Sequence, residues 1–160
     1  ALPILAPDGP MCPCGGRGCV EAVCSGPGIA QLAAWIAEQE PALWRAGKLA
    51  AEYDSAGEVS SKRIMSAWEA GDRFAGAVVD RAAGYLAQAL AAAINLLSPD
   101  VVVVGGGVVA GNSAFLESVS EKVRPQVVFY FREHYRIVPT RLGKEVVSQG
   151  AAILAAQSVE

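Results

Sequence analysis

A short cysteine-rich segment, residues 11 to 21, constrains the fold more than any other part of this chain. Its sequence is MCPCGGRGCVE, in which Cys12, Cys14 and Cys19 are interleaved with glycines. Thiolates this close together can converge on one soft metal ion, and glycines let the backbone curl around it. Tetrahedral zinc takes four ligands, so the segment supplies all but one of them.

The fourth ligand must come from Cys24, from His134 or from outside the chain. Cys24 stands near the start of an expected helix, where a packing role suits it better. His134 is the only histidine and stands among aromatic residues, which is typical of a surface or packing residue. A sulfur-rich set favours structural zinc over catalytic zinc, because no ligand position is left for water. The alternative to a metal site is a tight turn of small buried cysteines, which glycines at ligand spacing argue against.

Composition and charge narrow the class of protein. The 160 residues suit one domain, and 52% of them are apolar, enough for a sizeable core. The net charge is -3 and no run of Lys or Arg occurs, which argues against a nucleic-acid surface in this chain.

The start of the chain and its longest apolar stretch indicate where in the cell the protein is expected to be. No apolar signal segment opens the sequence, so clustered cysteines indicate a metal site in the reducing cytoplasm. The longest apolar stretch, 82 to 97, contains Gln88 and Asn95 and is short for a membrane span, so we expect a buried helix and no membrane. The chain begins at Ala1 without a methionine, and we expect it to be a piece of a longer protein.

Apolar periodicity and capping residues predict alternating helices and buried strands, hence an α/β sandwich. Ser25, Ser60 or Ser61, Asp72, and Asn112 or Ser113 are the expected helix starts. The valine run 101–104 is expected to be a strand buried on both faces. The predicted helices are 25–38, 41–49, 60–68, 72–97, 112–122 and 150–157, and the other predicted strands are 2–5, 127–130 and 136–139.

Two further features point to ligands. Glu21 follows the cysteine segment, and a carboxylate fixed by a rigid loop is a good acceptor for two neighbouring sugar hydroxyls; a solvated glutamate in a first helical turn is the alternative. Gly105, Gly106 and Gly107 come directly after the valine strand. At the carboxyl end of a strand such glycines permit close approach of a nucleotide, although a plain glycine-rich turn fits equally well.

Taken together, these features resemble the ROK family, which groups bacterial sugar kinases with sugar-responsive repressors. The match is to the family pattern Cys-x-Cys-Gly-x-x-Gly-Cys-x-Glu followed by Ser-Gly, and it runs along nearly the whole chain. The residues that carry it are Cys12-Pro-Cys14-Gly15-Gly-Arg-Gly18-Cys19-Val-Glu21, Ser25-Gly26, Ala70-Gly71-Asp72, Asn95 to Asp100, Val101 to Gly107 and Gly150-Ala151-Ala152.

The resemblance implies an actin/hexokinase-like (ribonuclease H-like) fold whose lobes hold ATP and sugar between them. The chain would be the C-terminal lobe, a single domain 1–160 with a zinc and sugar loop at 1–25 and a nucleotide-side sheet and helices at 101–160. It further implies a cytoplasmic homodimer that uses ATP and magnesium.

The same resemblance assigns the site residues. Cys12, Cys14 and Cys19 become ligands of a structural zinc, completed by an upstream histidine in place of Cys24. Glu21 binds sugar hydroxyls. The glycine segment, Gly105, Gly106 and Gly107, approaches the adenosine end of ATP.

The chain also departs from the family. The phosphate-binding Asp-x-Gly-x-Thr strand and the aspartate that serves as general base are both absent from the 160 residues. We therefore expect part of an ATP-dependent hexokinase or glucokinase, acting on glucose or a related hexose, that is inactive as an isolated chain. The alternatives are a sugar-sensing transcriptional repressor of the same family and a small zinc-stabilised interaction module; the intact glycine segment favours the kinase.

Overall fold

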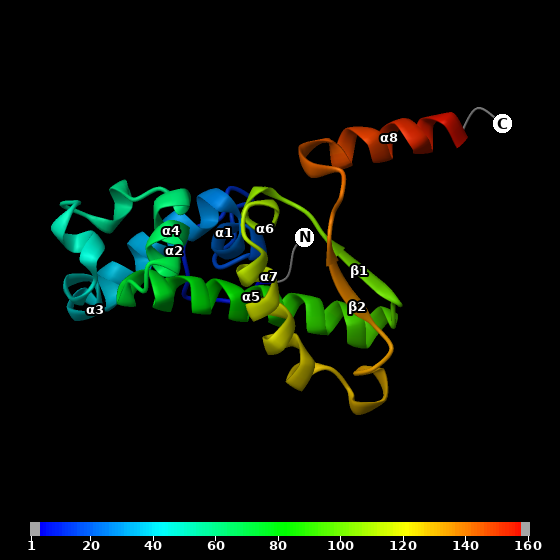
Figure 1. Ribbon diagram of the computed structural model, residues 1–160, viewed down its shortest axis with the longest axis horizontal. Helices are drawn as coiled ribbons and strands as arrows, with labels where there is room; N and C mark the ends of the chain where they lie inside the picture. The colour runs from blue at the N-terminus through cyan, green and yellow to red at the C-terminus, as the bar shows by residue number, and fades with distance from the viewer. Residues whose placement is uncertain (1–3, 158–160) are drawn as a thin grey trace.

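One long helix organises the chain. The structure is a computed structural model that describes residues 4–157. In it α5 (Arg73–Leu97) runs through the molecule, and α1 (Val20–Cys24), α2 (Gly26–Gln39), α4 (Ser61–Glu69) and α7 (Ser113–Val123) pack against it (Figure 1). Its small buried residues, Ala75, Ala82, Ala83, Ala87 and Ala91, allow this close packing.

By length and composition α5 would also pass for a membrane-spanning helix, a test that buried core helices meet too. Its buried side chains include Phe74, Val78 and Ile94, all fully buried. Tyr85, Leu86 and Leu90 are partly buried and pack against the same core. The packing of α5 against its neighbours is that of the expected core helix.

Shorter elements complete the described chain. Four of the expected helix starts are found as predicted: the side chains of Ser25, Ser60, Asp72 and Asn112 each accept a hydrogen bond from a backbone N–H in the first helical turn. The remaining elements are the helices α3 (Pro41–Ala46), α6 (Gly107–Ala110) and α8 (Val146–Gln157) and the 3-10 turns Lys48–Ala51, Ala56–Glu58, Arg124–Gln126, Phe129–Phe131 and Gly143–Glu145.

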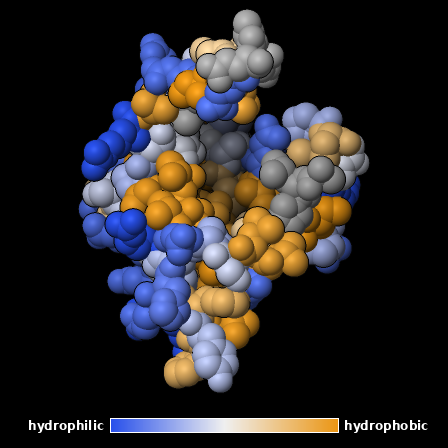
Figure 2. Space-filling view, turned by 90° about the vertical axis from the view of Figure 1, so that its right-hand side faces the viewer, coloured by the Kyte–Doolittle hydropathy of each residue, from blue (hydrophilic) through white to orange (hydrophobic). Residues whose placement is uncertain are grey.

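The described sheet has two parallel strands, β1 (Val101–Val104) and β2 (Arg136–Pro139), with Val101 opposite Arg136. The α/β class is therefore correct, but burial of β1 on both faces is not. Val102 and Val104 pack against the core, whereas Val101 is 38% exposed and Val103 60% exposed. Figure 2 views the molecule from the end that carries the sheet and shows apolar side chains gathered around a hollow.

The predicted strand at 127–130 is wrong. Asn95 of α5 occupies the backbone groups that a strand would use: its amide donates to the Gln126 carbonyl at 3.0 Å and accepts from the Val128 N–H at 2.9 Å. The chain then turns into the 3-10 turn Phe129–Phe131. A single side chain from a distant helix has overridden the local β propensity.

Three other boundaries differ from expectation. The predicted helix 41–49 ends at Ala46, and Lys48–Ala51 forms a separate 3-10 turn. In the predicted strand 2–5, Leu2 and Pro3 lie outside the described residues, and Ile4 forms one antiparallel bridge with Cys19. The last helix starts at Val146, before the predicted start at Gly150. The side chains of 151–157 are exposed, so α8 projects from the helical body (Figure 1).

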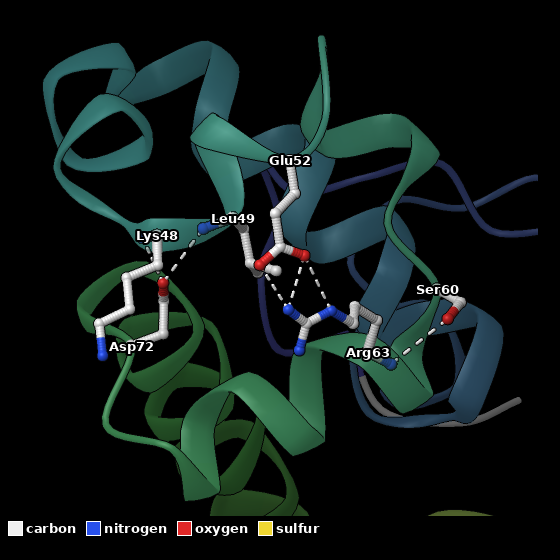
Figure 3. Close-up of polar contacts among 6 residues, drawn as sticks. All are labelled: Lys48, Leu49, Glu52, Ser60, Arg63 and Asp72. Atoms are coloured by element: carbon white, nitrogen blue, oxygen red, sulfur yellow. Dashed lines mark hydrogen bonds and ion pairs between the residues drawn. The ribbon is translucent and has the colours of Figure 1, made fainter.

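Asp72 connects α5 to the segment before α4. Asp72 is 3% exposed, and its carboxylate accepts hydrogen bonds from the backbone N–H groups of Lys48 and Leu49 (Figure 3). It also accepts one from the backbone N–H of Ala75. The Ala75 bond caps α5, and the other two hold the 3-10 turn Lys48–Ala51. A buried carboxylate is stable here because three backbone donors replace its water.

We expect Asp72→Ala to lower the free energy of unfolding by about 2–4 kcal/mol, because it removes a helix cap and also the acceptor of the buried Leu49 N–H and the part-buried Lys48 N–H. Ser60→Ala is the matched control: Ser60 caps α4 through the Arg63 N–H, at an exposed site (Figure 3). Its loss should cost about 1 kcal/mol. Urea unfolding followed by circular dichroism measures both, and equal losses would contradict the special role of Asp72.

Candidate functional site

The cysteine segment folds into a tight loop held by its own backbone. The Cys12 N–H donates to the Gly16 carbonyl at 2.8 Å, and the Gly15 N–H donates to the Cys12 carbonyl at 2.9 Å. These bonds turn the sulfurs of Cys12, Cys14 and Cys19 toward one another, so that all three lie within 4.8 Å. Three convergent thiols in a loop of this kind could hold one soft metal ion.

The two candidates for a fourth ligand do not join this group of sulfurs. Cys24 is buried in the helical core, where its thiol donates to the Ala82 carbonyl at 3.3 Å. It is therefore a packing cysteine, as expected, and burial raises its pKa to about 12. His134 is exposed and follows the turn Phe129–Phe131.

Two of the clustered thiols, Cys14 and Cys19, have pKa values shifted in opposite directions. The Gly16 backbone N–H, together with hydrogen bonds from Cys12 and Cys19, lowers the pKa of Cys14. The contact between the Cys14 and Cys19 sulfurs, 3.5 Å apart, raises the pKa of Cys19 to about 11, and burial adds to it. Of these two thiols, Cys14 is therefore the more readily deprotonated, and the thiolate is the form that binds a metal ion.

Gly18 fixes the loop against the start of the chain. Its carbonyl accepts from the N–H groups of Leu5 and Ala6, at 2.9 and 3.2 Å. A Cβ atom at Gly18 would lie 1.7 Å from the Ala6 carbonyl oxygen, and its φ of +60° is unfavourable for other residues. Only glycine fits this close approach of two backbones.

Glu21 lies in the first turn of α1, immediately after the cysteine loop. The loop ends at Cys19, which is the residue before the helix. At the other end of α1 the Ser25 hydroxyl donates to the Glu21 carbonyl at 2.6 Å. The side chain of Glu21 is exposed, so its carboxylate is free to accept hydrogen bonds from a ligand.

The glycine segment lies beside Glu21, although the two are far apart in the sequence. β1 ends at Val104, Gly106 takes a φ of +127°, and α6 begins at Gly107. A cavity of about 300 Å³ is lined by both Glu21 and Gly105 to Gly107. The structure therefore brings the expected sugar-binding and nucleotide-binding residues to one cavity.

A larger cavity of about 620 Å³ adjoins the first and shares Gly26, Gly107 and Val108 with it. One face of α4 supplies Ser61, Lys62, Met65, Ser66 and Glu69 to its wall, and Gly111 and Asn112 close it. Sequence analysis missed these positions, because polar residues at helical spacing are also typical of a solvated face.

The chain is similar to proteins of known function. The family model described as "ROK family" matches residues 3–158. A glucokinase from Thermotoga maritima is 33% identical over 150 residues, which cover 93% of this chain and 46% of that protein.

Solved structures agree with the sequence comparison. A ROK family glucokinase from Streptomyces griseus, in complex with glucose and AMPPNP, superposes with a TM-score of 0.76 and 28% identity, over 98% of this chain and 50% of that one. A ROK family transcriptional regulator, a homologue of the E. coli MLC protein, superposes with a TM-score of 0.63 and 28% identity, over 86% of this chain and 33% of that one. The chain spans less than half the length of the curated relatives it matches.

We expect Gly18→Ala to lower the free energy of unfolding by more than about 2 kcal/mol, because its Cβ would force the two backbones apart. The sulfurs should separate with them, so less zinc should bind per chain. Gly16→Ala is the matched control, since its Cβ would meet the Cys19 sulfur at an ordinary 3.4 Å. Urea unfolding and metal analysis compare the variants, and equal behaviour would show that the Gly18 contact is unimportant.

Proposed function

Because this chain belongs to the ROK family, we propose that it is the C-terminal lobe of an ATP-dependent sugar kinase acting on glucose or a related hexose. One observation carries the proposal: Glu21 and the glycine segment, which suit a sugar and a nucleotide respectively, line the same cavity. The glucokinase relative and the glucokinase structure with glucose and AMPPNP support the same assignment.

In this proposal Glu21 orients the sugar by accepting hydrogen bonds from two neighbouring hydroxyls. Gly105 to Gly107 let the nucleotide approach the end of β1 closely, and the adjoining cavity of about 620 Å³ takes the nucleoside. A carboxylate from the other lobe removes the proton of the attacking hydroxyl, whose oxygen then attacks the γ-phosphate of ATP. Magnesium, when bound with ATP, neutralises charge on the phosphates.

Cys12, Cys14 and Cys19 hold a structural zinc in the same proposal, supported by the convergence of their sulfurs. A ligand from outside the described chain completes the set. Zinc stiffens the loop that leads into α1 and so fixes the position of Glu21, without taking part in the reaction. The complete protein is proposed to be cytoplasmic and homo-oligomeric.

A sugar-sensing repressor is the second candidate, favoured by the likeness to the ROK transcriptional regulator. The same lobe would then bind a sugar through Glu21 and pass the signal to a DNA-binding part elsewhere in the protein. A repressor has less need of a nucleotide cavity. The small zinc-stabilised module has no supporting relative among these matches.

The kinase assignment predicts that the complete protein releases ADP when glucose or a related hexose and magnesium ATP are supplied. Glu21→Gln should lower kcat/KM for the sugar by roughly a hundredfold, since a charged acceptor for the hydroxyls is lost. Glu38→Gln, an exposed glutamate on α2 outside the cavities, is the control and should have no effect. A coupled ADP assay measures both; sugar binding without ADP release would support the repressor instead.

We further predict that the purified 160-residue chain does not phosphorylate sugar. The chain lacks the phosphate-binding strand and the general base, so neither the γ-phosphate nor the attacking hydroxyl would be activated. The measurement is ADP formation with and without glucose at high chain concentration. Sugar-dependent ADP release above that of a heat-treated sample would show that the chemistry resides in this lobe.

A further inference from the structure

One face of α4 carries charges of opposite sign along the larger cavity. Lys62, Met65, Ser66 and Glu69 follow the spacing of residues on a single helix face, and all four line the cavity. Lys62 lies in the first turn of the helix, and Glu69 is its last residue, about 10 Å further along the axis. Met65 gives the wall between them an apolar surface.

The Glu69 carboxylate is held in place by Asn112. The Asn112 amide donates to Glu69 Oε1 at 2.5 Å, while its own carbonyl oxygen caps α7 by accepting from the Phe115 N–H at 2.9 Å. Asn112 is only 8% exposed, so its side chain cannot turn without losing both bonds. Within the described chain no hydrogen bond uses Glu69 Oε2, which leaves one acceptor for a ligand.

Position on the helix makes Glu69 unusual. A carboxylate at the C-terminal turn lies beside the negative end of the helix dipole, which disfavours it. A glutamine there would accept the same bond from Asn112 at no such cost. A ligand that donates an N–H to the carboxylate would offset this unfavourable placement.

The charges also run in a direction that matches a nucleotide. The Lys62 end of α4 meets the start of α2, because a Cβ at Gly26 would lie 3.7 Å from the Ser61 hydroxyl oxygen. Gly26 also lines the cavity of Glu21, so the positive end of the wall faces the place where phosphates would lie. Glu69 is at the far end, where the base would lie.

We infer that Glu69, positioned by Asn112, reads the base of the nucleotide and selects adenine over hypoxanthine. This inference rests on the proposed function. Adenine carries an exocyclic amino group that donates to a carboxylate oxygen, whereas hypoxanthine has a carbonyl oxygen at the same position. A carboxylate attracts the first group and repels the second.

The test compares the binding of magnesium ATP and magnesium ITP to the complete protein by calorimetry. The wild type should bind ATP about tenfold more tightly than ITP, which is the effect expected of one partly exposed charge-assisted hydrogen bond. Glu69→Gln should bring the two affinities close together, because the amide can turn a donor toward the ITP oxygen. Lys62→Met is the matched control. The affinities for ATP and for ITP should fall by the same factor, so the ratio between them should stay unchanged.

Asn112→Asp tests the positioning role separately. Aspartate can still cap α7, but it cannot donate to Glu69 and repels it, so the variant should also unfold at a lower temperature. The preference for ATP over ITP should fall, measured at a temperature where circular dichroism shows the variant to be folded.

Three results overturn the inference and leave the kinase assignment intact: an unchanged ratio in Glu69→Gln, no preference in the wild type, and tighter binding of GTP than of ATP. If the wild type binds no nucleoside triphosphate at all, the proposed function fails as well. Circular dichroism of each variant shows that a lost preference does not come from a lost fold.

Discussion

The fold depends on how one buried carboxylate satisfies three backbone amides. Asp72 fixes the first turn of α5 and the chain before α4 with the same two oxygen atoms. Gly47 tightens this junction, because a Cβ there would lie only 2.6 Å from the Cβ of Phe74. α5 then provides the surface on which α1 and α7 pack. α1 carries Glu21, and Asn112 is the residue that caps the start of α7. The site thus takes its geometry from a polar contact remote from any ligand.

Contacts between residues close in sequence, such as helix caps, were predictable from the sequence. Burial that depends on elements distant in the sequence was not. Helix starts at Ser25 and Asp72 follow from a side-chain oxygen that reaches an N–H in the next turn, a contact within a few residues. The exposure of Val103 depends on what lies over the sheet, which no local pattern records. The turn at 129–131 depends on Asn95, a partner on a distant helix.

The candidate site divides in the same way. Spacing and glycine content alone indicated that the sulfurs of Cys12, Cys14 and Cys19 would meet, because the loop is short. Only the family resemblance predicted that Glu21 would lie beside Gly106, because Glu21 precedes α5 in the sequence and Gly106 follows it. Glu69 could not be found at all from sequence, because its role depends on an amide that reaches it from the start of α7.

The exposed valines of β1 affect how this chain behaves in solution. Within the described residues β1 pairs on one side only, with β2, and two of its four side chains face outward. A bare strand edge beside an apolar surface is a template on which other chains can add. Concentrated samples of this 160-residue chain would therefore tend to self-associate through extended backbone, and the chain stays monomeric only where this edge is covered.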